Sequence, residues 1–318
     1  MRVRRLATAE GLTENPTDEQ IGATIEHAGE TGYWLDIQGP EEKDFDLLRD
    51  VFHFHQVAIR DIRIPNPRPK LYEFSGYAFL VLFTATWRNR SLQVEEQHLF
   101  LSPKGMVSVH DEPQPGIDEL FNDIRQGRDA VEGGFAFDVA DNLVSSIFPV
   151  IDDMDGAIDE LQDRTLRDAS PQILAEIYDI KHDVTKLHRL LGAQLDALQR
   201  LITHLLEVKH ESLSVYFRSV YDHTVRQFEI ADSLRDLLAS VLDVYLSSVS
   251  NRLNVTMKQL TVIASVFLPL SFLTGFFGMN FAFLVDHIGT PLTFFLGLGV
   301  MVLSTLIQLA FFKRRGWI

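Results

Sequence analysis

The chain has 318 residues, 46% of them hydrophobic, and a formal net charge of −15 at pH 7. This length and apolar content exclude a disordered chain and a mini-protein. The acidic balance argues against nucleic acid and anionic lipid as partners and favours cations. The absence of cysteine excludes disulfides and thiolate metal sites, and it fits a reducing compartment.

Residues 1–134 are expected to form a cytoplasmic α/β domain. The first fifteen residues lack the apolar run of a secretory signal peptide. Helices are predicted at 17–30 and 44–54, and the PNPRPK segment at 65–70 should force extended chain. Strands rich in β-branched and aromatic residues are predicted at 32–38, 77–87, 96–102 and 105–111.

Residues 135–254 show helical patterns, with helices predicted at 137–167 and 171–206. Ser170 before Pro171 is typical of a helix start. Apolar residues then recur every three or four positions, with one skipped position, as in a coiled-coil seam: Ile173, Ile177, Ile180, Val184, Leu187, Leu191, Leu198, Leu201 and Leu205. A third helix should begin near Ser212 and continue for about 65 residues, because no proline interrupts it before Pro269. Such a stalk is expected to bundle with the other helices and with other subunits.

Two stretches without charged residues, 260–285 and 290–312, exceed the roughly 20 residues needed to span a bilayer as helix. They predict transmembrane helices at 255–280 and 290–312, joined by an extracytoplasmic loop at 281–289 and followed by a basic tail at 313–318. The alternative, a buried hairpin in a soluble protein, would rarely need apolar residues on every face. Lys and Arg flank the spans and avoid the loop, so both termini should be cytoplasmic in a multi-pass protein of the cell (inner) membrane.

A short motif, Gly278-Met279-Asn280, stands at the end of the first predicted span. With the Tyr245–Asn251 segment, the Lys313–Arg315 cluster and Trp317, it closely resembles the CorA family of divalent-cation channels. The segments Trp34–Asp36 and Arg68–Lys70, followed by Tyr77–Val81, are also similar to the soluble domain of that family.

The resemblance implies a funnel-shaped homopentamer that carries Mg²⁺, and also Co²⁺ or Ni²⁺, inward through the lipid bilayer under control of intracellular Mg²⁺. No organic cofactor is implied, and because no phosphate loop, nucleophile elbow or catalytic carboxylate pair is present in the sequence, no enzymatic activity is expected. Two alternatives stay open. The chain could be a zinc transporter of the same superfamily, or a membrane-anchored coiled-coil interaction protein.

Physical chemistry explains why Gly278, Met279 and Asn280 suit a selectivity filter. Mg²⁺ holds its water tightly, so neutral oxygens should contact the hydrated ion. A ring of Asn280 amide and Gly278 backbone carbonyls would bind first-shell water weakly enough to release the ion. The alternative is that Gly278 and Asn280 only cap the helix.

Helical spacing upstream of this motif predicts a pore-lining stripe in which polar, small and apolar residues alternate. Its members are Asn254, Met257, Leu260, Thr261, Ala264, Leu268, Ser271 and Gly275. Met257, Leu260 and Leu268 would form constrictions that close by dewetting. The alternative is ordinary helix packing, and Pro269 is expected either to kink the span or to be absorbed by neighbouring helices.

The resemblance also implies a regulatory Mg²⁺ site between subunits, at the positions that match Asp61 and Asp243. The alternative is that both are ordinary surface acids. Asp152, Asp153, Asp155 and Asp159 are interpreted as a solvated helix face. Among the histidines, neither His53 with His55 nor His204 with His210 has the helical spacing of a zinc pair, so these are expected to be structural or surface residues.

Overall fold

The computed structural model describes residues 2–27, 32–64, 68–127, 134–279, 282 and 290–317. The chain divides into two compact units. The first unit comprises Met1–Arg164 and Ser170–Leu242, and the second comprises Thr165–Ala169 and Asp243–Ile318. The predicted boundary near residue 134 falls inside the first unit, because helices beyond it pack on the sheet.

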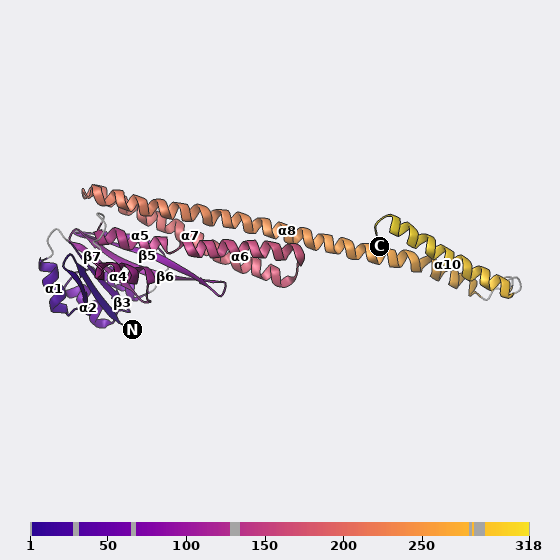
Figure 1. The fold of residues 1–318 in the computed structure, drawn as a ribbon, viewed down its shortest axis with the longest axis horizontal. Coiled ribbons are helices and arrows are strands. Elements are labelled where there is room, and N and C mark those ends of the chain that lie inside the picture. Colours follow the sequence, from indigo (N-terminus) through magenta and orange to yellow (C-terminus); the bar gives the residue numbers. More distant parts are fainter. Residues whose placement is uncertain are drawn as a thin grey trace. The chain divides into compact units, whose positions relative to one another are not determined.

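The first unit is built on a β-sheet (Figure 1). The sheet has seven strands in the order β2-β1-β3-β7-β6-β5-β4. Neighbouring strands are antiparallel except for the parallel pair of β3 and β7. The strands are β1 (Val3–Thr8), β2 (Gly11–Glu14), β3 (Tyr33–Gln38), β4 (Lys70–Phe74), β5 (Tyr77–Arg88), β6 (Ser91–Ser102) and β7 (Gly105–His110).

Helices on both sides of the sheet make this unit an α/β domain. They are α1 (Asp18–His27), α2 (Glu42–Asp50), α3 (Gln56–Arg63), α4 (Pro115–Arg125), α5 (Gly134–Ser145), α6 (Phe148–Arg167) and α7 (Pro171–Glu207). The last three residues of α6 belong to the second unit. The remaining helices are α8 (Glu211–Phe277), whose first half lies in the first unit, and α10 (Pro291–Arg314) in the second.

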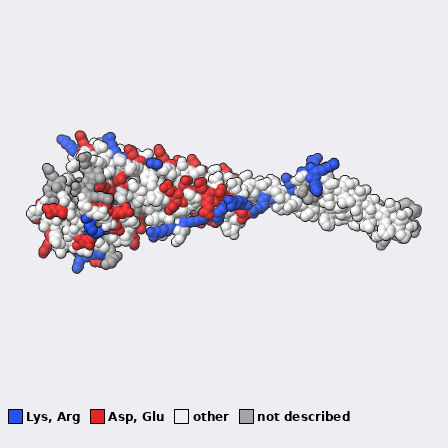
Figure 2. Space-filling view, in the orientation of Figure 1, with Lys and Arg blue, Asp and Glu red and all other residues white. Residues whose placement is uncertain are grey.

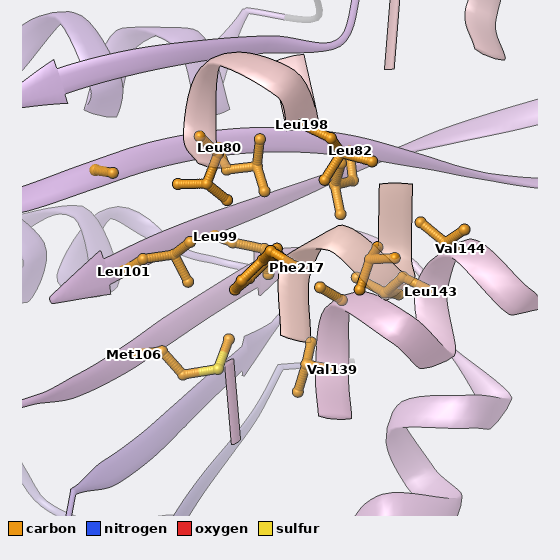
Figure 3. Packing of buried hydrophobic residues seen from close by; sticks show 14 of the residues in the cluster. Leu80, Leu82, Leu99, Leu101, Met106, Val139, Leu143, Val144, Leu198 and Phe217 are labelled. Carbon is orange, nitrogen blue, oxygen red and sulfur yellow. The ribbon is translucent and has the colours of Figure 1, made fainter. Parts of the chain in front are cut away.

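The central strands are buried along almost their whole length. Because successive side chains of a strand point to opposite sides, both faces of the sheet must be covered. On one face, Leu80 and Leu82 of β5 join Leu143 of α5, Leu198 of α7 and Phe217 of α8 in the main apolar cluster (Figure 3). On the other face, Phe54 from the α2–α3 connection stacks on Phe100 with ring centroids 3.9 Å apart. The first unit therefore has an extensive core of its own.

Helix α7 buries the predicted seam, and the structure explains its skipped position. All nine predicted seam residues are buried. The skipped position is Gln194, which is also buried, and its amide oxygen accepts a hydrogen bond of 2.9 Å from the Phe83 backbone nitrogen. The amide therefore binds the main chain of β5 within the core.

Several predicted elements differ from those observed. The predicted helix at 137–167 is interrupted after Ser145 and resumes at Phe148, where Pro149 suits a first turn but not a helix interior. The predicted helix at 44–54 ends at Asp50, and His53 takes a left-handed φ of 56°. The sequence analysis missed five elements: β1, β2, β4, α3 and α4. The single long helix was predicted correctly, since α8 has 67 residues and continues through Pro269.

Candidate functional site

Three described helical stretches are long and apolar enough to cross a membrane by length and composition, namely Gly134–Arg167, Glu211–Phe277 and Pro291–Arg314. Their most apolar windows are 39%, 6% and 0% buried, respectively. The first stretch was not predicted to span. It places Val139, Leu143 and Val144 in the core of the sheet unit, and its Asp152, Asp153, Asp155 and Asp159 are exposed, as a solvated face should be.

The other two stretches carry large side chains that contact little of the described protein. Leu268 is 72% exposed and Phe294 is 65% exposed. Acidic and basic residues crowd the surface of the sheet unit, whereas α10 and the second half of α8 are almost free of them up to a basic cluster near the C-terminus (Figure 2). Burying such apolar surface is favourable only in lipid or against other helices.

Residues 251–277 of α8 have two different faces. The partly or fully covered residues among them recur at helical spacing: Val262, Ser265, Val266, Pro269, Leu270 and Leu273. Helix α10 has a matching row of covered residues: Thr293, Gly297, Met301, Ser304, Thr305, Gln308 and Phe312. Figure 1 draws α10 alongside this end of α8, within the same unit. One face of α8 is therefore covered by α10.

The predicted pore-lining stripe lies away from this covered face. All eight of its residues are exposed: Asn254, Met257, Leu260, Thr261, Ala264, Leu268, Ser271 and Gly275. Elsewhere on the exposed surface, Ile263 and Phe267 are purely apolar, as suits contact with lipid. The hydroxyl of Thr261 donates to the Met257 carbonyl at 2.7 Å, so its oxygen lone pairs remain available as acceptors. The stripe thus offers polar oxygens on a surface that one chain leaves open.

Gly278 stands where the last turn of α8 tightens. Its backbone nitrogen donates to the Thr274 carbonyl at 2.9 Å, and Met279 donates to the Phe276 carbonyl at 3.3 Å. A Cβ at Gly278 would lie 2.9 Å from that same Thr274 oxygen, which is closer than real contacts allow. A larger residue would disturb this turn. Asn280, the third predicted filter residue, lies outside the described residues.

The predicted regulatory acids have different surroundings. Asp61 on α3 is buried, and its Oδ2 lies 2.7 Å from the Lys70 ammonium of β4. Its negative charge is therefore already compensated within the sheet unit, and a metal ion would have to share the carboxylate. Asp243 on α8 is exposed. The sequence analysis missed the Lys70 partner because the pairing depends on the fold.

Asp36, part of the segment that carries the family resemblance, has a structural role. Its side chain is fully buried, with Oδ2 2.8 Å from Arg5 Nη2 and Oδ1 3.2 Å from His110 Nε2. Ser108 donates to Asp36 at 2.5 Å, and the Trp34 indole donates to Ser108 at 2.8 Å. This network links β1, β3 and β7 at the centre of the sheet.

The network also shifts two pKa values. Burial alone would raise the pKa of Asp36, but the charges of His110 and Arg5 outweigh burial and lower it. Burial alone would lower the pKa of His110, but the Asp36 carboxylate and the Glu112 carbonyl outweigh burial and raise it. The folded state therefore favours the charged form of both groups.

An α/β unit followed by two membrane-length apolar helices defines a membrane protein with a large polar domain. The family described as CorA-like Mg²⁺ transporter protein matches residues 29–314, and the chain belongs to this family. YfjQ of Bacillus subtilis (strain 168) is 32% identical over 90% of this chain and 89% of its own length. The cobalt/magnesium transport protein CorA of Thermotoga maritima is 29% identical over 91% of this chain and 84% of its own length.

Relatives with another named cargo also match. The zinc transport protein ZntB of Yersinia pestis is 25% identical over 90% of this chain and 88% of its own length. Among solved structures, the complete CorA magnesium transporter from Methanocaldococcus jannaschii has a TM-score of 0.82 at 19% identity, covering 100% of this chain and 99% of that one. The predicted fold class is confirmed. The chain is a membrane-bound divalent metal-ion transporter of the CorA family.

Proposed function

We propose that this protein is a Mg²⁺ channel, built from five copies of the chain, that also passes Co²⁺ or Ni²⁺ into the cytoplasm. The observation that carries the proposal is the contrast between the two faces of α8. Helix α10 covers one face, while a stripe of polar, small and apolar residues is left open in a single chain. Several copies arranged around an axis would turn these stripes toward each other and enclose a polar path.

Gly278, Met279 and Asn280 form the proposed selectivity filter. The tight turn at Gly278 supports this assignment, because it requires a residue without a side chain at this position. Five Asn280 amides would supply neutral acceptors for the water shell of Mg²⁺. Neutral oxygens bind a hydrated dication weakly enough for it to leave.

The apolar members of the stripe form the proposed gate. Met257 and Leu260 are each 59% exposed on the pore face, so five copies would place apolar rings on the axis. A narrow apolar ring excludes water and therefore ions when the helices move together. Asn254, Thr261 and Ser271 would contact hydrated ions between these rings, while the small Ala264 and Gly275 would leave the path wide.

Asp61 and Asp243 form the proposed regulatory site between neighbouring subunits. Carboxylate oxygens suit Mg²⁺, which usually takes one or two of them and keeps water in its other positions. Asp243 is exposed and forms no ion pair with the described residues, so it is available to a neighbouring copy. Because Lys70 already neutralises Asp61, we expect Asp243 to contribute more of the affinity.

Both termini are proposed to lie in the cytoplasm, with the spans at 255–280 and 290–312 in the cell (inner) membrane. Arg252 precedes the first span and pairs with Asp168 at 2.7 Å, and Lys313 and Arg314 end α10. Basic residues flanking spans favour the cytoplasmic side. Influx then needs no other energy source, because moving two charges through 100 mV releases roughly 4.6 kcal/mol.

Zinc is the second candidate cargo, because relatives named as zinc transport proteins also match this chain. By contrast, membership in a transporter family argues against a chain that only tethers a coiled coil. The test is ion flux into liposomes that contain the purified full-length protein, with Mg²⁺, Co²⁺ and Zn²⁺ compared. We expect Mg²⁺ entry that follows the membrane potential, and native mass spectrometry in detergent should show five subunits. Zn²⁺ flux without Mg²⁺ flux, or a stable monomer, would contradict the proposal.

A further inference from the structure

A group of possible metal ligands lies in the sheet unit, away from the proposed pore. Glu73 of the edge strand β4 meets His204 and Glu207 of α7, and one ligand atom from each lies within 4.8 Å of the other two. Glu73 and Glu207 are exposed, whereas His204 is only partly so. The spacing of the histidines in the sequence gave no sign of this group, because Glu73 comes from a distant strand.

Glu73 lies beside two side chains of α7 that can carry positive charge. Its Oε2 lies 3.4 Å from His204 Nδ1, and its Oε1 lies 3.7 Å from the guanidinium of Arg200, one helical turn before His204. The two oxygens of the Glu73 carboxylate therefore face different partners, and Oε2 is the one that lies beside the imidazole.

Backbone hydrogen bonds close the end of α7. Lys209 takes a left-handed φ of 63°, Lys209 N donates to the Leu206 carbonyl at 3.1 Å, and His210 N donates to the Leu205 carbonyl at 2.8 Å. This turn fixes the last helical turn, which carries His204 and Glu207. A helix C-terminus bears partial negative charge, so the electrostatics there favour a cation. His210 and His204 line the same cavity of about 200 Å³.

We propose that Glu73, His204 and Glu207 form a site for a transition-metal ion such as Zn²⁺ or Co²⁺. An imidazole nitrogen is a good ligand for these ions, whereas Mg²⁺ prefers oxygen ligands alone. Two carboxylates balance the charge of a divalent ion, and three protein ligands leave a fourth position for water. The site goes beyond the proposed channel activity and does not depend on it, since binding is measured at equilibrium without ion flux.

The test uses the full-length protein in detergent, stripped of metal and titrated with Co²⁺ while visible absorption is recorded. We expect the wild-type protein to show a Co²⁺ band that is lost in His204→Gln. Glu73→Gln and Glu207→Gln should each lower the affinity for the Co²⁺ that gives this band by about tenfold or more. Zn²⁺ should displace this Co²⁺, whereas a large excess of Mg²⁺ should not, which separates this site from any Mg²⁺ site in the pore.

Matched controls come from the same helix. His182 and Asp179 are exposed on α7 and outside the group, so His182→Gln and Asp179→Asn should bind Co²⁺ as the wild type does. Circular dichroism checks that each variant is folded, and if His204→Gln is not, the two exposed glutamate variants decide. Wild-type Co²⁺ binding in the folded ligand variants, or displacement by Mg²⁺, would overturn the assignment.

Discussion

The sheet unit buries its large apolar side chains, whereas the apolar helices leave many of theirs exposed. In the sheet unit, Leu80 and Phe217 are fully buried, and even the charged Asp36 is enclosed by Arg5 and His110. In the second unit, α10 covers one face of α8 while Leu260 and Leu268 remain exposed. The first unit therefore buries its large apolar side chains within one chain. The second leaves apolar side chains exposed, and the open stripe is the surface on which the proposed pore depends.

The expected effect with the largest consequence for function is on transport. Asn280→Ala should lower Mg²⁺ flux in liposomes by at least about tenfold, because it removes the proposed ring of amide acceptors. Gln259→Ala is the matched control, since this exposed amide on α8 lies outside the stripe and its loss should leave flux unchanged. Wild-type flux in correctly assembled Asn280→Ala would remove Asn280 from the filter.

The next effect separates the two units by stability. Phe217→Ala should destabilise the sheet unit by about 3–5 kcal/mol, because it opens a cavity in a closed core. Leu268→Ala, a truncation of an exposed side chain, should leave that stability unchanged. Urea unfolding followed by tryptophan fluorescence measures both, because Trp34 stacks on Phe121 in the same cluster and contributes to the signal. Equal losses in the two variants would show that the units do not differ in the way described.

The buried charge network gives a pH-dependent prediction. Because folding raises the pKa of His110, its stabilisation is complete below the ordinary value of 6.5 and is lost as pH rises through the raised value. Because folding lowers the pKa of Asp36, its stabilisation is present above 3.8 and is lost as pH falls through the lowered value. Asp36→Asn should lower the free energy of unfolding by about 3 kcal/mol near neutral pH. It should also abolish the loss of stability that the wild type shows as pH rises. Urea unfolding at several pH values tests this, and an unchanged decline would assign it to another group.

The smallest expected effect concerns regulation. Asp243→Asn should raise the internal Mg²⁺ concentration that closes the channel by about fivefold, because it removes one proposed ligand between subunits. Asp236→Asn, an exposed acid of the same helix, is the control and should close as the wild type does. Flux measured against internal Mg²⁺ gives both values. Identical closure in the two variants would place the sensor elsewhere.

Local patterns predicted those parts of the fold that depend on local chemistry. Runs without charge marked the apolar helices, and apolar spacing located the buried seam of α7. Strand β1 was missed because Arg4 and Arg5 look like surface residues, yet they are buried, with Arg4 Nε 2.6 Å from an Asp44 oxygen and Arg5 paired with Asp36. Ion pairs between distant segments cannot be recognised by a local pattern.

The candidate sites also include residues that local spacing identified and contacts that only the fold reveals. Helical spacing picked out the stripe from Asn254 to Gly275, and the structure leaves every member exposed. The assignment of those residues to a pore stays a prediction. In contrast, the Lys70 partner of Asp61 and the meeting of Glu73 with His204 depend on how β4 lies beside α3 and α7, which no periodicity along the chain encodes.

The most direct test of the pore assignment uses the natural absence of cysteine, because any introduced thiol is then unique. Ser271→Cys places a thiol on the open stripe, and Leu273→Cys places one on the covered face of the same helix. A hydrophilic, membrane-impermeant thiol reagent should modify Ser271→Cys, stop its Mg²⁺ flux, and react more slowly when Mg²⁺ is present, while Leu273→Cys stays active. Equal modification of the two thiols, or modification of Ser271→Cys without loss of flux, would contradict a pore lined by this face of α8.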